Sequence, residues 1–394
     1  MTRGSLYLAW RYVARHKGKT AVLVAAIALV AYLPAALHLL VEQGAEDLRR
    51  RAADTPWIIG AKGSPLELVL GSLYFESAPP DALSMHEVER IRKTGFARTV
   101  PLAIRFRARG HAIIGTTLDY FDFRRLRVRE GRSLATLGEC VLGSAVAENL
   151  RKAPGDAIVS TPENAFDLAG AYPLKMKIVG VLAPSGTPDD LAIFVDLKTN
   201  WIMQGLGHGH QDLAQPEASP LVLERTDDKV TANAAVAQYN EITAENIDGF
   251  HFHGDPSEFP VTAILAIPHN EKDAALLAGR YLSPTDPAQI VRPLDVINEL
   301  LATVLTIRAA LTAGALAVGC STVLIVGLVF LLSLRLRRRE LLTMSKIGCS
   351  RSLIASMVLL EIAFVCGWAA VLAGGLTYLT GRFSNEAVRL VLFS

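Results

Sequence analysis

Three long apolar stretches interrupt a chain that is otherwise rich in polar residues. They run from Thr20 to Val41, from Ala309 to Leu334 and from Leu353 to Leu379. At a rise of about 1.5 Å per residue, each is long enough to cross about 30 Å of hydrocarbon as a helix. The pattern therefore predicts three transmembrane helices. A cleaved signal peptide is the alternative for the first stretch, but the apolar run is too long for one.

Charged residues beside these stretches predict their orientation. Basic residues precede the first stretch and separate the second from the third: they are Arg3, Arg11, Arg15, Lys17 and Lys19, and then Arg335, Arg337, Arg338, Arg339, Lys346 and Arg351. Because cytoplasmic loops are enriched in lysine and arginine, both flanks are expected in the cytoplasm. Arg49, Arg50 and Arg51 run against this rule, and we interpret residues 42–51 as a helical stalk that continues the first span outward.

These boundaries predict the organisation of the whole chain. It consists of a cytoplasmic amphipathic segment (1–19), a first transmembrane helix (20–41), a periplasmic domain with stalks (42–308), a second transmembrane helix (309–334), a cytoplasmic loop (335–352), a third transmembrane helix (353–380) and a periplasmic tail (381–394). The large domain is thus inserted between the first and second spans.

The outward-facing region has the pattern of a mixed α/β domain. Alternating apolar positions predict strands at Ala103–Phe106, Ile113–Thr116, Lys177–Leu182 and Ala192–Val195. Short helices are expected at Ser84–Lys93 and at Ser144–Lys152, the latter with a serine N-cap. The polar stretch Gly205–Ser219 predicts a linker before a second lobe, and Leu294–Thr306 predicts a second stalk helix. The predicted fold class is therefore α+β, with transmembrane and stalk helices attached to this domain.

The loop between the second and third spans has the features of a rigid turn between helices. A short basic helix is expected over Arg337–Ile347, with apolar contacts from Leu341, Leu342, Met344 and Ile347. Gly348 can adopt the left-handed conformation that ends such a helix, and Ser350 or Ser352 can cap the next one. Such a rigid turn can transmit a movement from a cytoplasmic partner to the membrane helices. The alternative is that its arginines only set the topology.

One carboxylate, Glu361, lies about two turns into the third span. A carboxylate inside a membrane is a functional candidate by default, because burying its charge in hydrocarbon is costly. Near the cytoplasmic end, however, it can reach the loop. We therefore expect Glu361 to pair with a loop arginine such as Arg338 or Arg351.

Net charge and cysteine usage exclude several classes of function. The formal net charge of +2 gives no reason to expect nucleic-acid binding. The four cysteines, Cys140, Cys320, Cys349 and Cys366, provide neither a disulfide framework nor zinc-ribbon spacing. Residues 18–20 read Gly-Lys-Thr, like the end of a phosphate-binding loop, but Val13 replaces the upstream glycine and a membrane span follows. We expect no ATP site, no cofactor and no catalytic residue here.

Histidines concentrate in one part of the outward-facing region. Five of the nine are His208, His210, His251, His253 and His269. In 250–253 phenylalanine and histidine alternate, so a strand would place both imidazoles on one face. Gly209 would let its two neighbouring histidines turn toward one ion. Together with Asp255, the two pairs predict a zinc site, which needs about four ligands. The alternative is that they are surface or capping histidines without a metal.

Three stretches resemble the MacB/FtsX-like (type VII) family of ABC transporter permeases. The start, LAWRYVARHKGKTAVLVAAIAL (8–29), resembles the basic amphipathic entry into the family's first membrane helix. The middle, GRSLATLGECVLGSAVAENLRKAPGDAIV (131–159) and KIVGVLAPSGTPDDLAIFVDL (177–197), resembles its periplasmic core. The stretch RRRELLTMSKIGCSRSLIASMVLLE (337–361) resembles the loop that docks on the partner ATPase. Residues 205–292 match only loosely.

This resemblance implies a non-catalytic permease subunit in the inner membrane of a bacterium. A dimer of ABC ATPases would dock at Arg337, Arg338, Arg339, Glu340, Leu341, Met344, Ile347, Gly348 and Ser350. Two copies of the chain would form a homodimer in contact with membrane lipids, and ATP-driven closure would move the periplasmic domains. The family usually has four membrane helices, whereas three are visible here.

The stretch DGFHFHGD (248–255) resembles a zinc-associated subgroup of the family. This implies zinc uptake or envelope zinc handling, with zinc as cargo or ligand and a periplasmic zinc-binding protein as a partner. Two alternatives remain. One is extraction or efflux of a lipoprotein, peptide or drug, and the other is a mechanotransmitter that controls a periplasmic partner without transporting anything.

Overall fold

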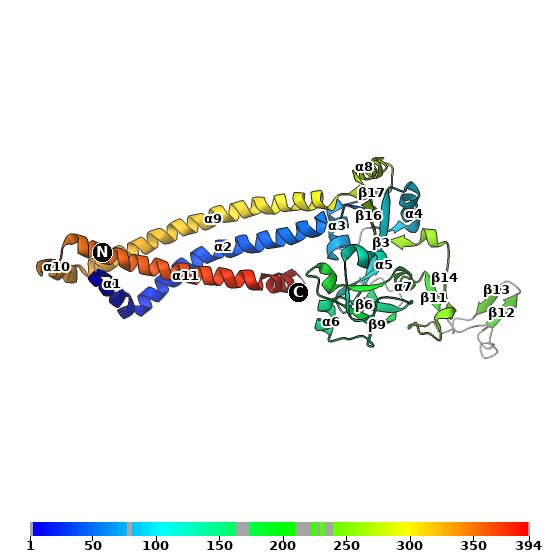
Figure 1. Cartoon of the computed structure of the whole chain (residues 1–394), viewed down its shortest axis with the longest axis horizontal. Coiled ribbons are helices and arrows are strands. Elements are labelled where there is room, and N and C mark those ends of the chain that lie inside the picture. The colour runs from blue at the N-terminus through cyan, green and yellow to red at the C-terminus, as the bar shows by residue number, and fades with distance from the viewer. Residues whose placement is uncertain are drawn as a thin grey trace. The chain divides into compact units, whose positions relative to one another are not determined.

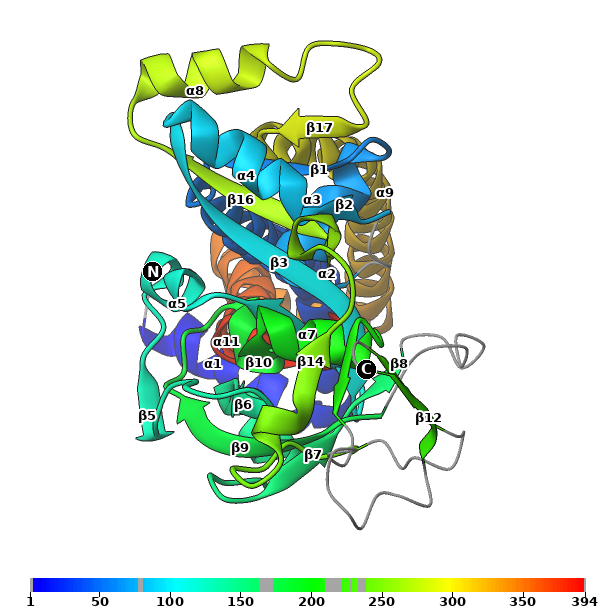
Figure 2. The ribbon, with the colours of Figure 1, turned by 90° about the vertical axis from the view of Figure 1, so that its right-hand side faces the viewer.

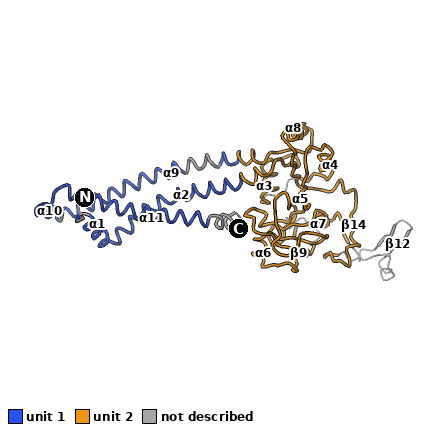
Figure 3. The backbone as a smooth tube through the Cα atoms, viewed as in Figure 1, with its two compact units in different colours: residues 1–48, 299–394 blue, residues 49–298 orange. Residues whose placement is uncertain are grey.

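A computed structural model of the chain describes residues 3–76, 81–162, 173–209, 222–226, 229–232 and 239–392 (Figure 1). The chain divides into two compact units, coloured separately in Figure 3. Unit 1 comprises residues 1–48 and 299–394, and unit 2 comprises residues 49–298.

Unit 1 is built from three long helices and two short ones in the part of the chain that the structure describes. The helices that form it, wholly or in part, are α1 (Arg3–Arg15), α2 (Lys17–Ala53), α9 (Pro293–Leu336), α10 (Arg338–Lys346) and α11 (Arg351–Leu392). Three helical stretches are long and apolar enough to cross a membrane: Lys17–Ala53, Thr312–Leu336 and Arg351–Phe383. The three helices predicted from the apolar stretches are therefore present.

The two predicted stalks are also helical. α2 runs without a break from the first apolar stretch through residues 42–51, and α9 begins at Pro293, one residue before the predicted second stalk. α11 differs from expectation, because it continues as a helix to Leu392 instead of ending near residue 380. No helix-breaking residue follows Gly381 in that stretch, which is why the helix can continue.

Unit 2 is a mixed α/β domain organised around one large sheet. Its strand order is β17-β1-β16-β3-β4-β10-β6-β9-β5, with β7 paired to β9 and β8 paired to β3. The strands are β1 (Trp57–Ala61), β3 (Ala97–Ala108), β4 (His111–Thr116), β5 (Val128–Gly131), β6 (Glu139–Leu142), β7 (Ala157–Val159), β8 (Thr161–Pro162), β9 (Lys175–Leu182), β10 (Ile193–Asp196), β16 (Ala263–Pro268) and β17 (Ala288–Val291). The mixed α/β class predicted for this region is confirmed.

Shorter elements surround this sheet. The helices are α3 (Pro65–Tyr74), α4 (Met85–Thr94), α5 (Leu118–Arg124), α6 (Ser144–Leu150), α7 (Leu197–Met203), α8 (Glu271–Gly279) and the 3₁₀ turns η1 (Pro188–Leu191), η3 (Ile247–Gly249) and η4 (Pro256–Glu258). Three two-stranded ribbons pair β2 (Leu83–Ser84) with β15 (Pro260–Val261), β11 (Gly207–Gly209) with β14 (Phe250–Phe252), and β12 (Val222–Thr226) with β13 (Lys229–Ala232).

The long strand β3, seen along its length in Figure 2, contributes residues to two hydrophobic cores. Its first half pairs with β16 and its second half with β4, and the register shifts between Ile104 and Phe106. We call the core beside β1 and β16 the first core; it contains Ile59 of β1, Ile264 of β16 and Trp201 of α7. The second core lies beside β4, β6, β9 and β10 and contains Ile113 and Ile178.

The structure corrects two details predicted for unit 2. Among the described residues after 219, β16 does not belong to a separate lobe, because it lies between β1 and β3 and thus completes the first core. An apolar strand such as β16 is most stable where both of its neighbours bury it. The N-cap of α6 is Gly143, and Ser144 is the first helical residue. The four strands predicted at Ala103–Phe106, Ile113–Thr116, Lys177–Leu182 and Ala192–Val195 are confirmed.

Candidate functional site

The ribbon formed by β11 and β14 brings histidines together from distant parts of the sequence. The antiparallel register pairs Gly207 with Phe252, His208 with His251 and Gly209 with Phe250. Because side chains alternate across a strand, the two imidazoles share one face while the phenylalanine rings lie on the other. His253 follows two residues after His251 and therefore continues the histidine face. None of the three histidines is buried.

The glycines of β11 make room for the phenylalanine rings. A Cβ at Gly207 would lie 2.7 Å from Cδ1 of Phe252, and one at Gly209 would lie 2.5 Å from Cδ2 of Phe250. Real side chains essentially never pack so closely, so the rings rest directly on the glycine backbone. This explains the two residue patterns together: Gly-His-Gly on one strand accommodates Phe-His-Phe on the other.

His208, His251 and His253 have the geometry of a metal-binding group. Their ring centroids lie 4.8 Å apart in all three pairs. One possible ligand atom from each lies within 4.8 Å of the others. Imidazole nitrogens bind Zn²⁺ at about 2.0–2.1 Å, so the three rings would have to draw closer together to share one ion. The geometry therefore supports the residue choice, and metal binding itself stays a prediction.

The other predicted ligands have different outcomes. His210 lies outside the described residues. Asp255 does not belong to the three-histidine group: it is the N-cap of η4, and its carboxylate accepts a hydrogen bond of 2.9 Å from the Ser257 amide. That hydrogen bond lowers the pKa of Asp255. The following Pro256 favours this helix start, so the Asp255 carboxylate caps η4 although it lies only two residues after His253 in the sequence.

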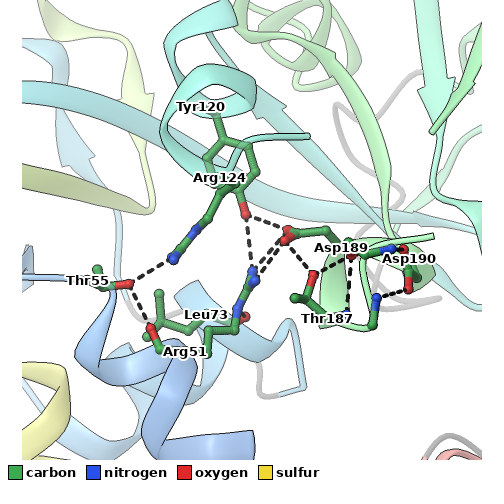
Figure 4. Close-up of polar contacts among 10 residues, drawn as sticks. Arg51, Thr55, Leu73, Tyr120, Arg124, Thr187, Asp189 and Asp190 are labelled. Atoms are coloured by element: carbon green, nitrogen blue, oxygen red, sulfur yellow. Dashed lines mark hydrogen bonds and ion pairs between the residues drawn. The ribbon is translucent and has the colours of Figure 1, made fainter. Parts of the chain in front are cut away.

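A second polar cluster in unit 2, absent from the sequence-based predictions, surrounds Arg51 at the end of α2 (Figure 4). The guanidinium of Arg51 makes two hydrogen bonds to the Asp189 carboxylate, at 2.7 Å from Nη1 and 2.9 Å from Nη2. It also donates to the Leu73 carbonyl and to the Tyr120 hydroxyl. The side chain of Arg51 is 5% exposed and that of Asp189 is 1% exposed. A buried charge pair of this kind must be fully hydrogen-bonded to be tolerated.

Asp189 is also satisfied by neighbouring hydroxyl groups. Tyr120 donates to it at 2.6 Å and Thr187 at 2.9 Å. Burial alone would raise the pKa of Asp189, but the Arg51 charge and the hydrogen bonds from Arg51 and Tyr120 lower it to about 2. Burial and the Asp189 charge raise the pKa of Tyr120 to about 12. The carboxylate is therefore ionised and the phenol neutral over the physiological range.

This cluster, which we call the Arg51 network, extends back to the helix that carries Arg51. Arg124 donates to the Thr55 hydroxyl at 2.9 Å, and Thr55 donates to the Arg51 carbonyl at 3.1 Å. The network therefore binds the last turn of α2 to α5 and η1. In the sequence, the only signal of this network is that Arg51 runs against the rule that basic residues flank membrane spans on the cytoplasmic side.

The loop between α9 and α11 has the local structure predicted for it. α10 covers Arg338–Lys346, Gly348 has φ 99°, and Ser350 accepts a hydrogen bond from the Leu353 amide. Arg338, Arg339 and Ile347 are exposed. Leu341 and Met344 are half-buried, and the side chain of Glu340 lies outside the described part of the chain.

Arg337 has an internal role instead of an exposed one. Its guanidinium pairs with Glu361 at 3.1 Å and lies 3.5 Å from the centroid of the Tyr12 ring. Glu361 therefore does pair with a loop arginine, but that arginine is Arg337 and not Arg338 or Arg351. A carboxylate inside the helix bundle can reach only a side chain that points inward, and Arg337 is 11% exposed.

Comparison with known protein families identifies a family for this chain. The family model for the MacB-like periplasmic core domain matches residues 23–242. One similar solved structure is the periplasmic region of MacB from Actinobacillus actinomycetemcomitans, which is 13% identical, has a TM-score of 0.34 and is matched over 65% of this chain and 96% of its own length. Another is the extracellular domain of the noncanonic ABC-type transporter YknZ from Gram-positive bacteria, which is 12% identical, has a TM-score of 0.30 and is matched over 59% of this chain and 98% of its own length. No curated protein matches. The family match spans more than half of the chain, which therefore belongs to the MacB-like family of ABC transporter components.

Proposed function

We propose that this chain is the permease subunit of a MacB-like ABC transporter that couples ATP hydrolysis by a separate ATPase to motion of its extracytoplasmic domain, and that it acts in zinc uptake or envelope zinc handling. Family membership supports the transporter class. The three-histidine group is the observation that carries the zinc assignment. The working unit is a homodimer in the inner membrane, bound to an ATPase dimer and supplied by a periplasmic zinc-binding protein.

Continuous helices support the coupling mechanism. α2 extends unbroken from the first apolar stretch to Ala53, and its last turn is bonded into the extracytoplasmic domain by the Arg51 network. A helix held by a buried, bidentate ion pair cannot slide without breaking several hydrogen bonds at once. A displacement of the helix would therefore be passed to η1 and α5 instead of being absorbed at the junction.

The exposed face of α10 is the proposed docking site for the ATPase. Arg338 and Arg339 present charge there, while Arg337 fixes the loop to Glu361 and Tyr12. The variant R338E/R339E should lose co-purification of ATP-hydrolysing activity from detergent extracts. R98E/R105E, which reverses two exposed arginines of β3, is the matched control for charge. Wild-type levels of co-purified activity in R338E/R339E would exclude this face as the docking site.

Zinc titration of the full chain in detergent tests the zinc assignment. Wild-type protein should bind Zn²⁺ with micromolar or tighter affinity, and H251A/H253A should lose this binding because two of the three clustered imidazoles are removed. H86A/H269A is the control, since the three-histidine group contains neither residue. Absence of micromolar binding by the wild type, or unchanged binding by H251A/H253A, would contradict direct zinc coordination by this chain.

A further inference from the structure

Strand β14, which carries His251 and ends one residue before His253, also touches both hydrophobic cores of unit 2. Phe250 packs against the second core alone, whereas Phe252 packs against the first and the second. On the first-core side, the Phe252 ring lies 5.9 Å from that of Phe259, which in turn lies 5.0 Å from Trp201. Phe252 is thus an apolar contact shared by the two cores, and its neighbours on either side in sequence are His251 and His253.

Helix α7, like β3, also contributes residues to both cores. Its residues Leu197 and Trp201 belong to the first core, and Ile202 and Met203 belong to the second. α7 ends at Met203, and β11 with His208 begins at Gly207. The His253 amide donates to the Leu206 carbonyl at 3.0 Å. The three-histidine group therefore sits directly on the connection between α7 and Phe252.

The pairing that forms the group is short and non-local. β11 and β14 are three residues each, and their paired histidines, His208 and His251, lie far apart in the sequence. A two-stranded ribbon is marginally stable in water without support from packing. A metal bound by residues from both strands would add its binding free energy to that pairing, because opening the ribbon would break the site.

We propose that metal binding at the three-histidine group clamps β14 onto β11 and, through Phe252 and α7, stiffens the junction between the two cores of the extracytoplasmic domain. This inference rests on the zinc site of the proposed function and assigns it a regulatory role. Occupancy of an exposed site is thereby converted into rigidity of the domain that the ATPase is proposed to move. The chain then distinguishes its zinc-loaded from its zinc-free form without a large rearrangement.

Amide hydrogen exchange of the full chain in detergent, with and without Zn²⁺, measures this effect. If opening of the junction requires release of the ion, exchange slows by the factor 1 + [Zn²⁺]/Kd, or about tenfold at ten times Kd. The slowing should appear in β11 and β14 and also in α7 and residues 256–261. H251A/H253A should show no slowing in any of these segments.

Two phenylalanine variants form a matched pair. F250L and F252L alter neighbouring rings on the same face of β14, but only Phe252 contacts both cores. F250L should retain the zinc-dependent slowing in α7, whereas F252L should bind Zn²⁺ and show slowing in the ribbon alone. If F252L does not fold, G207A displaces the Phe252 ring without altering a histidine, and G209A displaces the Phe250 ring as its control.

The outcomes separate the two proposals. Zinc binding with slowing confined to the ribbon in wild-type protein would overturn the stiffening of the junction and leave the zinc site intact. Equal slowing of α7 in F250L and F252L would also overturn it. No zinc binding by the wild type would overturn the zinc site and with it this inference. Slowing of α7 that is lost in F252L but kept in F250L is the result that supports it.

Discussion

The extracytoplasmic domain contains two polar clusters that differ in almost every physical respect. The Arg51 network is buried, carries opposite charges, and gives each charged group several hydrogen-bond partners. The three-histidine group is accessible to solvent, and its three side chains are of the same kind and face one another. Buried charges must be satisfied internally because water cannot reach them, whereas exposed imidazoles can exchange water for a metal ion. The first cluster is suited to fixing geometry and the second to reversible binding.

Removal of one partner from the Arg51 network should have the largest effect on stability. R51A leaves the Asp189 carboxylate buried without its counter-charge, which should cost about 3–5 kcal/mol of the free energy of unfolding of this domain. Chemical denaturation followed by tryptophan fluorescence measures this loss. R50A, which removes an exposed arginine from the same turn, should change the free energy by less than about 0.5 kcal/mol. Equal effects of the two variants would contradict the assigned role.

A fully apolar replacement sharpens this test. R51M/D189L/Y120F removes both charges and the hydroxyl that would otherwise be left unpaired. Buried ion pairs replaced by apolar groups of similar volume often lose no stability, so this variant should recover at least half of the R51A deficit. A triple variant as unstable as R51A would mean that packing around Arg51, and not its unpaired partner, dominates the loss.

The difference between the two clusters also explains which of them the sequence could reveal. Alternation of phenylalanine and histidine in 250–253 is a local pattern, and it correctly placed the imidazoles on one face. The pairing of β11 with β14 brings His208 to that face. In the sequence, the only sign of this pairing is the two glycines of β11, which leave room for the phenylalanine rings of β14. Arg51 and Asp189 are separated by 138 positions and belong to no local pattern.

The same reasoning applies to the fold. The apolar stretches and the strands near residues 113 and 178 were predictable, because hydrophobic periodicity is a local property. The insertion of β16 between β1 and β3 was not predictable, because the order of strands in a sheet depends on contacts between segments that are far apart in the sequence. Likewise Arg337, and not one of its neighbours, pairs with Glu361 because only its side chain points inward, and a run of three arginines does not indicate which one does so.

Zinc should stabilise the domain through the exposed cluster by a somewhat smaller amount. At a free concentration 100 times Kd, binding to the folded state alone adds about 2.7 kcal/mol to the free energy of unfolding. Thermal unfolding with Zn²⁺, and again after addition of EDTA, measures the gain and its reversal. H251A/H253A should show no gain, and H86A/H269A should behave as the wild type. A gain of the same size in H251A/H253A would place the bound zinc elsewhere.

Acidification should weaken the buried cluster in a defined pH window. The pKa of Asp189 is lowered from 3.8 to about 2, so its contribution is complete above about pH 4 and is lost as the pH falls through about 2. Across this window the wild type should lose about 2 kcal/mol more than R51M/D189L/Y120F, which has no carboxylate there. Urea midpoints at several pH values measure the difference. Glu139, whose pKa is also lowered to about 2, is present in both proteins and cancels. Parallel pH profiles would contradict an ionised Asp189.

The smallest effect should come from the exposed cluster in the absence of metal. With EDTA present, H251A/H253A should differ from the wild type by less than about 0.5 kcal/mol, because the imidazoles face solvent and bury no core surface. G207A should be more destabilising under the same conditions, since its Cβ would lie 2.7 Å from the Phe252 ring that contacts both cores. If the histidine variant were instead the less stable of the two, the imidazoles would be structural parts of the ribbon. The contrast between a cluster that fixes geometry and a cluster that binds reversibly would then fail, because both would hold the fold together.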